Sequence, residues 1–218
     1  MDNAFFVFLI IAVVIGACIH SYLAAKKRTE AMQELAKQMG FRFSPRKDRF
    51  IARKFGFLKH LNKGSNRYAH NILKGSTPDG EPAMIFDYHY QVSSGKTTTH
   101  YQYSVFMITL PRSFPELQIE PEGFGSRLKH VVGLGDIDFE SIEFSNAFDV
   151  RSRDKKFAYD FCNAQMIEYL MPYRNFLIEL DRNQLALVIQ QKLSTSLIQS
   201  YYRRLLKIRS LIPKYLFS

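Results

Sequence analysis

An uncharged, mostly apolar run near the N-terminus, from Asn3 to Ala25, constrains this chain more than any other part of its sequence. About 22 helical residues rising ~1.5 Å each span roughly 33 Å, which is enough to cross a hydrocarbon core of ~30 Å. Lys26, Lys27 and Arg28 follow the run directly. Basic residues are enriched on the cytoplasmic side of a span. The sequence therefore predicts a single-pass anchor with a basic stop at residues 1–28 in the inner (cytoplasmic) membrane, with the rest of the chain facing the cytoplasm.

A lipoprotein signal is the main alternative for the same run. Ile15-Gly16-Ala17-Cys18 places small residues before a cysteine, as such signals do, and a lipidated Cys18 would anchor the protein outside the cytoplasm. Signals for export carry positive charge before their apolar run, whereas this chain carries Asp2 there. The single span is therefore the favoured interpretation.

The formal net charge of +10 is concentrated beside the apolar run. Residues 26–74 hold 14 Lys and Arg against three acids, whereas residues 75–218 hold 16 of each sign. Anionic phospholipid headgroups attract such a segment by about 1 kcal/mol per well-placed basic residue. The basic residues expected to contact the membrane surface are Lys26, Lys27, Arg28, Arg42, Arg46, Lys47, Arg49, Arg53 and Lys54.

Two other interpretations of the basic segment remain. A basic stretch can bind nucleic acid, but a membrane tether and the lack of a recognisable nucleic-acid motif favour lipid, so no specific nucleic-acid partner is predicted. A solvated basic face that only sets the topology accounts equally well for the composition. A protein partner close to the bilayer is also compatible with the segment.

The chain beyond the anchor has the length of one ordinary domain. We expect a helical stalk and basic linker at residues 29–54 and a globular α+β domain at residues 55–218, in which helices pack on an antiparallel sheet. Helical periodicity predicts a helix from Asp154 to about Met171 and a final helix from Ser194 to Ile212. A hairpin is predicted between residues 175 and 190.

The clearest strand signal is a hairpin formed by Pro82–Val92 and Thr97–Leu110, which are rich in aromatic and β-branched residues. A two-residue turn at Ser94 and Gly95 would give the hairpin one apolar and one polar face. The apolar face comprises Met84, Phe86, Tyr88, Tyr90, Tyr101, Tyr103, Val105 and Met107. The polar face comprises Asp87, His89, Gln91, Thr98, His100 and Gln102.

The polar face contains the candidate metal site that the sequence favours most. The turn above puts His89 directly opposite His100, with Cβ atoms about 5 Å apart, and Asp87 lies two residues from His89 on the same face. Two imidazoles and a carboxylate could bind zinc or iron and activate a water molecule. A partly wet sheet face explains the same residues without a metal. No other cofactor is predicted, and no catalytic residue is identified.

A series of motifs covers roughly residues 30–172. The motifs are Asn71-Ile72-Leu73-Lys74-Gly75, Ile85-Phe86-Asp87-Tyr88-His89-Tyr90, Ser94-Gly95-Lys96, Leu110-Pro111, Ile119-Glu120-Pro121-Glu122, Asp136-Ile137-Asp138-Phe139 and Glu143-Phe144-Ser145. In these motifs the chain resembles a group of uncharacterised bacterial proteins with an N-terminal membrane helix and one soluble domain. The resemblance implies membrane association and a mixed α and β fold. It implies no activity and no site residues.

The charge distribution and the absence of a complete catalytic set in the sequence favour a non-catalytic protein. We expect a membrane-anchored module that binds a partner or the membrane surface. The alternative is a membrane-tethered, metal-dependent hydrolase that uses His89, His100 and Asp87.

Overall fold

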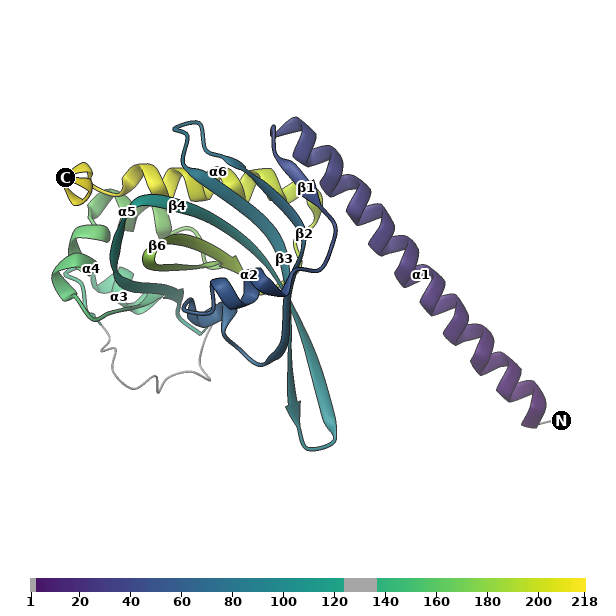
Figure 1. Ribbon diagram of the computed structural model, residues 1–218. Coiled ribbons are helices and arrows are strands. Elements are labelled where there is room, and N and C mark those ends of the chain that lie inside the picture. Colours follow the sequence, from purple (N-terminus) through teal and green to yellow (C-terminus); the bar gives the residue numbers. More distant parts are fainter. Residues whose placement is uncertain (1–2, 124–136) are drawn as a thin grey trace.

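A single long helix projects from a domain built on a curved sheet in the computed structural model, which describes residues 3–123 and 137–218 (Figure 1). The helix, α1 (Asn3–Gln38), has 36 residues. Its side chains are exposed from Phe5 to Lys27, and its most apolar part has a mean hydropathy of 2.5. Within the described residues, α1 is the one helix long and apolar enough to cross a membrane.

The last third of α1 belongs to the domain. Met32 and Ala36 are buried at its contact with the sheet. Gly40, with a φ of 69°, then turns the chain, and Phe41 packs beside the same core. Positive φ is available to glycine at little cost, which explains why the helix ends there. Residues 29–38 are therefore docked along their length.

Six antiparallel strands form one sheet in the order β1-β2-β3-β4-β5, with β6 also paired to β4. The strands are β1 (Arg42–Ser44), β2 (Ser65–Ser76), β3 (Pro82–Ser94), β4 (Thr97–Pro121), β5 (Phe148–Ser152) and β6 (Leu177–Ile189). β4 has 25 residues and pairs with three other strands, so it is the central element of the sheet.

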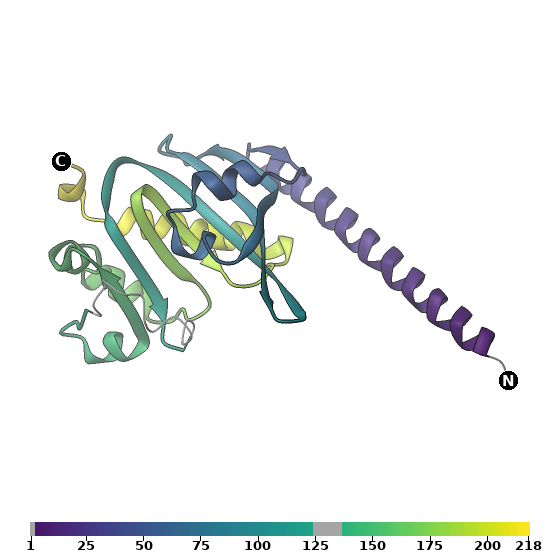
Figure 2. The ribbon, with the colours of Figure 1, turned by 60° about the horizontal axis from the view of Figure 1, so that its bottom comes forward.

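Helices cover both faces of the sheet. They are α2 (Arg49–Lys54), η1 (Lys59–Leu61), α3 (Ile142–Ala147), α4 (Lys155–Phe161), α5 (Ala164–Leu170), α6 (Thr195–Leu211) and η2 (Lys214–Phe217). The buried stripe of α6, which includes Tyr201 and Leu205, packs on one face together with the end of α1. α2 and η1 lie on the opposite face, as Figures 1 and 2 show from two sides. The predicted α+β fold is confirmed.

The β3–β4 hairpin is confirmed with a shifted turn. Ser94 pairs with Thr97, so Gly95 and Lys96 form the turn, and Gly95 takes the positive φ of 57°. Relative to the predicted register, each residue of β3 faces a residue two positions later in β4, so His89 lies opposite Gln102 instead of His100. A shift of two does not exchange the faces of a strand. The domain has two hydrophobic cores, one on each face of the sheet. The predicted apolar face accordingly lies in the second core, the one beneath α2 and η1.

Two other expectations differ from the structure. The helix expected from residue 154 to 171 is broken into α4 and α5, because Asn163 caps a new helix by accepting a hydrogen bond from the backbone of Met166. The hairpin expected between residues 175 and 190 is one bent strand, β6, with Arg182 at a φ of 54°. Within residues 29–54, β1 pairs with β2 in the sheet, and Ile51 of α2 is buried.

Candidate membrane-proximal site

Arg28 and Asp87 join α1 to the sheet. The guanidinium Nε donates to Asp87 Oδ2 over 2.8 Å and Nη2 donates to Oδ1 over 2.6 Å, a two-pronged pairing that suits the planar fork of arginine. The third nitrogen, Nη1, donates to the carbonyl of Leu193. Asp87 is only 1% exposed, so its charge depends on this partner.

Two polar side chains hold this ion pair in place. Asn71 Nδ2 donates to Asp87 Oδ2 over 2.9 Å, and the Thr29 hydroxyl of α1 donates to Asn71 Oδ1 over 3.3 Å. Asn71 occupies an irregularity in β2 with a φ of 49°, a conformation that asparagine tolerates better than most residues. Ser104 Oγ accepts from the Leu193 backbone N–H over 2.9 Å, which positions the carbonyl used by Arg28.

Arg28 is one of the basic residues that the sequence predicts at the membrane surface. In the structure its guanidinium is hydrogen-bonded within the domain, to Asp87 and to the carbonyl of Leu193. Arg28 lies three positions after Ala25, the last residue of the apolar run, which is about 4.5 Å along a helix. The domain is therefore attached immediately beside the apolar part of α1.

The structure does not bring the three predicted metal ligands together. The Asp87 carboxylate is bound to Arg28, and its nearest histidine is His70, with Nε2 3.9 Å from Oδ2. His89 and His100 instead contact one another. Among the described residues, no group of three or more His, Cys, Asp or Glu side chains could hold a metal ion. Arg28 occupies both oxygens of Asp87 and comes from 59 residues away in the sequence, so the alternation of the hairpin could not indicate this partner.

His89 and His100 form a paired unit near the base of the hairpin. His89 Nδ1 lies 3.2 Å from the Asn66 carbonyl and His89 Nε2 lies 3.1 Å from His100 Nδ1. A carbonyl only accepts, so neutral His89 carries its proton on Nδ1 and accepts from His100 at Nε2. The His89 ring also stacks on Tyr68, with centroids 4.6 Å apart, and Lys47 Nζ lies 4.6 Å from the Tyr68 ring centroid. Protonation of His89 would remove the acceptor of this contact.

We expect the domain to lose stability when the pH falls below about 6.5, the ordinary pKa of histidine. Burial lowers the pKa of His89 despite the opposing effect of the Asn66 carbonyl, and nearby His100 and Lys47 lower it further. Burial also lowers the pKa of His70 despite the opposing effect of Asp87. The folded state then binds fewer protons than the unfolded state, so this stability is complete above the unfolded pKa and is lost below it. Thermal unfolding at about pH 7.5 and pH 5 measures the loss, which should be smaller in a His70→Gln/His89→Gln variant. An equal loss in both proteins would contradict the expectation.

The other basic residues expected at the membrane occupy different parts of the domain. Lys26 and Lys27 are exposed on α1 just outside the docked segment. Lys47 lies over Tyr68, and Arg49 Nη2 donates to Asn66 Oδ1 over 3.0 Å, so both lie near the base of the β3–β4 hairpin. Arg42 lies beyond the other end of the docked helix, where it pairs with Lys74. The remaining three, all exposed, are Arg46, Arg53 and Lys54.

A second buried polar group was not foreseen from the sequence. The backbone N–H of His60 donates to Glu179, and His60 Nδ1 lies 2.8 Å from Glu179 Oε1. His60 Nε2 lies 3.4 Å from Glu120 Oε1, and all three residues are at most 4% exposed. The available signal was Glu179 itself, the one acid within the apolar run Phe176–Leu180. This cluster fixes η1 on the sheet.

No protein-family model and no curated protein matches the sequence, so no family or activity is assigned on that basis. Among solved structures, the crystal structure of the mycobacterial trehalose monomycolate transport factor A, TtfA, is similar, with a TM-score of 0.64. The two chains are 11% identical, and the match covers 85% of this chain and 96% of that chain. Identity this low shows a shared fold alone.

Proposed function

We propose that this chain is a membrane-anchored binding module whose domain is held in one orientation against the bilayer, with the β3–β4 hairpin toward the lipid headgroups. The proposed role of this module is non-catalytic. Its main support is the Arg28–Asp87 ion pair, which fixes the domain to α1 within a single helical turn of the apolar segment. A domain on a flexible linker would have no such orientation.

The direction of α1 along the sheet supports this pose. Arg28 contacts Asp87, whereas Phe41 packs on Gly75, since a Cβ at Gly75 would lie 2.4 Å from the Phe41 ring. Gly75 pairs with Ala83. Moving toward the N-terminus of α1 thus corresponds to moving along β3 from Ala83 past Asp87 toward the hairpin turn. Figures 1 and 2 both show the hairpin projecting from the domain on the side of the N-terminal end of α1.

The hairpin is long enough to reach the bilayer surface. Seven residues separate Asp87 from Ser94, which is about 23 Å of strand, whereas the apolar part of α1 begins about 4.5 Å from Arg28. The exposed tip from Ser93 to Thr99 is polar and carries Lys96, as suits headgroups rather than hydrocarbon. The hairpin also diverges from the axis of α1 (Figure 1), so its tip is not carried straight along the span, and the usual tilt of about 20° adds to the possible orientations.

The charges around the hairpin fit an anionic surface. Lys26, Lys27, Lys47, Arg49 and Lys96 are exposed on α1, at the hairpin base or at its tip. Each basic residue close to an anionic leaflet contributes about 1 kcal/mol, and the attraction fades within a Debye length of about 8–10 Å. Arg42 is not included, because it lies beyond the docked part of α1, about 15 Å of helix from Arg28.

The proposed location is the inner membrane with the domain in the cytoplasm, because basic residues directly follow the apolar run. TtfA is by name a transport factor, and the shared fold is compatible with a binding role at a membrane for this chain. A reporter fused after Ser218 should be active only in the cytoplasm. Activity on the far side, together with a lipid mass adduct abolished by Cys18→Ser, would establish the lipoprotein alternative instead.

A label at the hairpin tip tests the proposed pose directly. In full-length Cys18→Ser protein, a nitroxide at Lys96→Cys is expected to report lipid proximity in bilayer nanodiscs, and more strongly with anionic than with zwitterionic lipid. The matched position is Asp79→Cys in the exposed β2–β3 turn, at the opposite end of β3. That label should report water in both lipids. Equal exposure to water at both positions would disprove the proposed orientation.

A further inference from the structure

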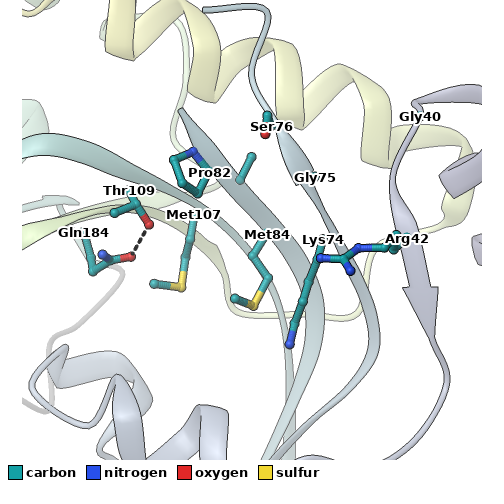
Figure 3. A pocket seen from close by; sticks show the side chains of 11 residues that line it. Gly40, Arg42, Lys74, Gly75, Ser76, Pro82, Met84, Met107, Thr109 and Gln184 are labelled. Atoms are coloured by element: carbon teal, nitrogen blue, oxygen red, sulfur yellow. Dashed lines mark hydrogen bonds between the residues drawn. The ribbon is translucent and has the colours of Figure 1, made fainter. Parts of the chain in front are cut away.

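A cavity of about 560 Å³ lies at the end of the sheet remote from the hairpin turn. It is lined by residues of β1, β2, β3, β4 and β6, together with Gly40, on the sheet face opposite α6 (Figure 3). Its volume is within the range of about 300–1,000 Å³ typical of small-molecule sites. Neither the membrane contact nor the histidine pair uses it.

Four of the lining residues form one row of paired residues across β1, β2, β3 and β4. Arg42 pairs with Lys74, Lys74 with Met84, and Met84 with Met107. Paired residues lie on the same face of a sheet, so the row places two cations beside two thioethers. Figure 3 shows the Arg42 side chain turned toward Lys74. The sulfur atoms of Met84 and Met107 lie on the other side of Lys74 from Arg42.

The two cations lack acidic partners. Like charges directly opposite one another destabilise a sheet pair, yet the cavity lining includes no Asp or Glu. Within residues 3–123 and 137–218, neither Arg42 nor Lys74 makes an ion pair or a side-chain hydrogen bond. Both side chains are exposed to solvent, and an anion placed between them would relieve the repulsion and accept hydrogen bonds from both.

The apolar side of the cavity completes its chemistry. Met84 is partly exposed and packs against the second core, where Met107 is buried. Methionine side chains are flexible and polarisable, so they adapt to ligands of irregular shape. Thr109 and Gln184 close this side, where the Thr109 hydroxyl donates to Gln184 Oε1 over 3.2 Å. Because these two polar side chains hydrogen-bond to each other, the thioethers of Met84 and Met107 provide the apolar surface for a ligand.

We infer that this cavity binds an anionic amphiphile, with its charged head between Arg42 and Lys74 and its apolar chain over Met84 and Met107. Charge complementarity and the apolar floor argue for one molecule that carries both features. The cavity lies beyond the docked part of α1, so such a ligand would be held away from the bilayer. This inference goes beyond the proposed membrane pose and does not depend on it.

Methionine-methyl NMR of the full-length protein in phosphatidylcholine nanodiscs provides the test. Octyl phosphate should shift the methyl signals of Met84 and Met107 saturably, and the double variant Arg42→Gln/Lys74→Gln should weaken binding at least about tenfold. Removing the like-charge pair should leave Tm unchanged or raise it by about 1–3 °C, so lost binding would not reflect unfolding. The matched control is Arg53→Gln/Lys54→Gln, which removes two exposed cations outside the cavity.

Three other ligands test separately the role of the cations, the role of the methionines and the class of molecule that binds. Equal binding of uncharged octyl glucoside would overturn the role of the cations. Equal binding of inorganic phosphate would overturn the role of the methionines, and comparable binding of an acidic peptide would reassign the cavity to a protein partner. Unchanged Met84 and Met107 signals would overturn the site as a whole. Each result can be obtained whether or not the Lys96 label contacts lipid, so failure of the cavity and failure of the membrane pose are distinguishable.

Discussion

Replacing Arg28 with alanine is expected to lower the unfolding free energy of the domain by about 3–5 kcal/mol, the usual cost of removing one partner from a buried ion pair. The variant leaves Asp87, 1% exposed, with Asn71 as its remaining hydrogen-bond donor, and leaves the carbonyl of Leu193 without its guanidinium partner. For a chain of this size the loss corresponds to a decrease in Tm of roughly 6–20 °C. Near-UV circular dichroism of the tyrosines in the detergent-solubilised full chain measures it.

Lys27→Ala is the matched control for this prediction. It removes a neighbouring cation of the same helix that is exposed, so we expect a change within about 0.5 kcal/mol. The double variant Arg28→Leu/Asp87→Leu should recover at least half of the lost stability, because it removes the buried charge together with its partner. A loss below about 1 kcal/mol for Arg28→Ala would show that the ion pair contributes little to docking.

The same variants connect docking to the proposed pose. If Arg28 fixes the orientation of the domain, the nitroxide at residue 96 should lose part of its lipid contact in Arg28→Ala and retain it in Lys27→Ala. Arg28→Lys should fall between them, since lysine keeps the charge but not the two-pronged geometry. Retained contact in Arg28→Ala would mean that the packing of Met32 and Ala36 alone orients the domain.

Patterns with a short period along the sequence predicted the fold best. The apolar run of α1 and the alternation in β3 and β4 depend on neighbouring residues, and the apolar face of the hairpin was assigned correctly although its turn was placed one residue early. The shift follows from Gly95, which takes the positive φ as the first residue of the turn. The amphipathic stripe of α6 likewise predicted its packing on the sheet.

Long-range partners could not be predicted in the same way. Asp87 appeared as one of several polar residues on a strand, and only the path of α1 across the sheet brings Arg28 to it from 59 residues away. β6 was read as a hairpin because Asp181-Arg182-Asn183 resembles a turn, but pairing with β4 on both sides of Arg182 keeps the strand continuous. The pairing of Arg42 with Lys74 is equally hidden in the sequence, because only the antiparallel contact of β1 with β2 brings these two cations together.

The second large effect is expected at the buried cluster beneath η1. His60→Ala should destabilise the domain by about 3–5 kcal/mol, because two carboxylates, Glu179 and Glu120, would remain buried without the imidazole that lies between them. The backbone N–H of residue 60 would still donate to Glu179, so the loss reports the side chain. Urea unfolding monitored by near-UV circular dichroism should show a lower midpoint with a similar slope.

Lys59→Ala offers the neighbouring control for His60. Its ion pair with Glu116, 2.8 Å long, involves side chains that are partly exposed, and such pairs contribute about 1 kcal/mol or less. If the difference between the two variants arises from uncompensated charge, His60→Ala/Glu179→Gln should be more stable than His60→Ala, since a neutral amide costs less to bury than an unpaired carboxylate. Equal stability of these two variants would show that lost packing of the imidazole, rather than charge, accounts for the effect. The membrane-facing pose rests on a separate ion pair, so neither outcome should alter the lipid contact of the hairpin.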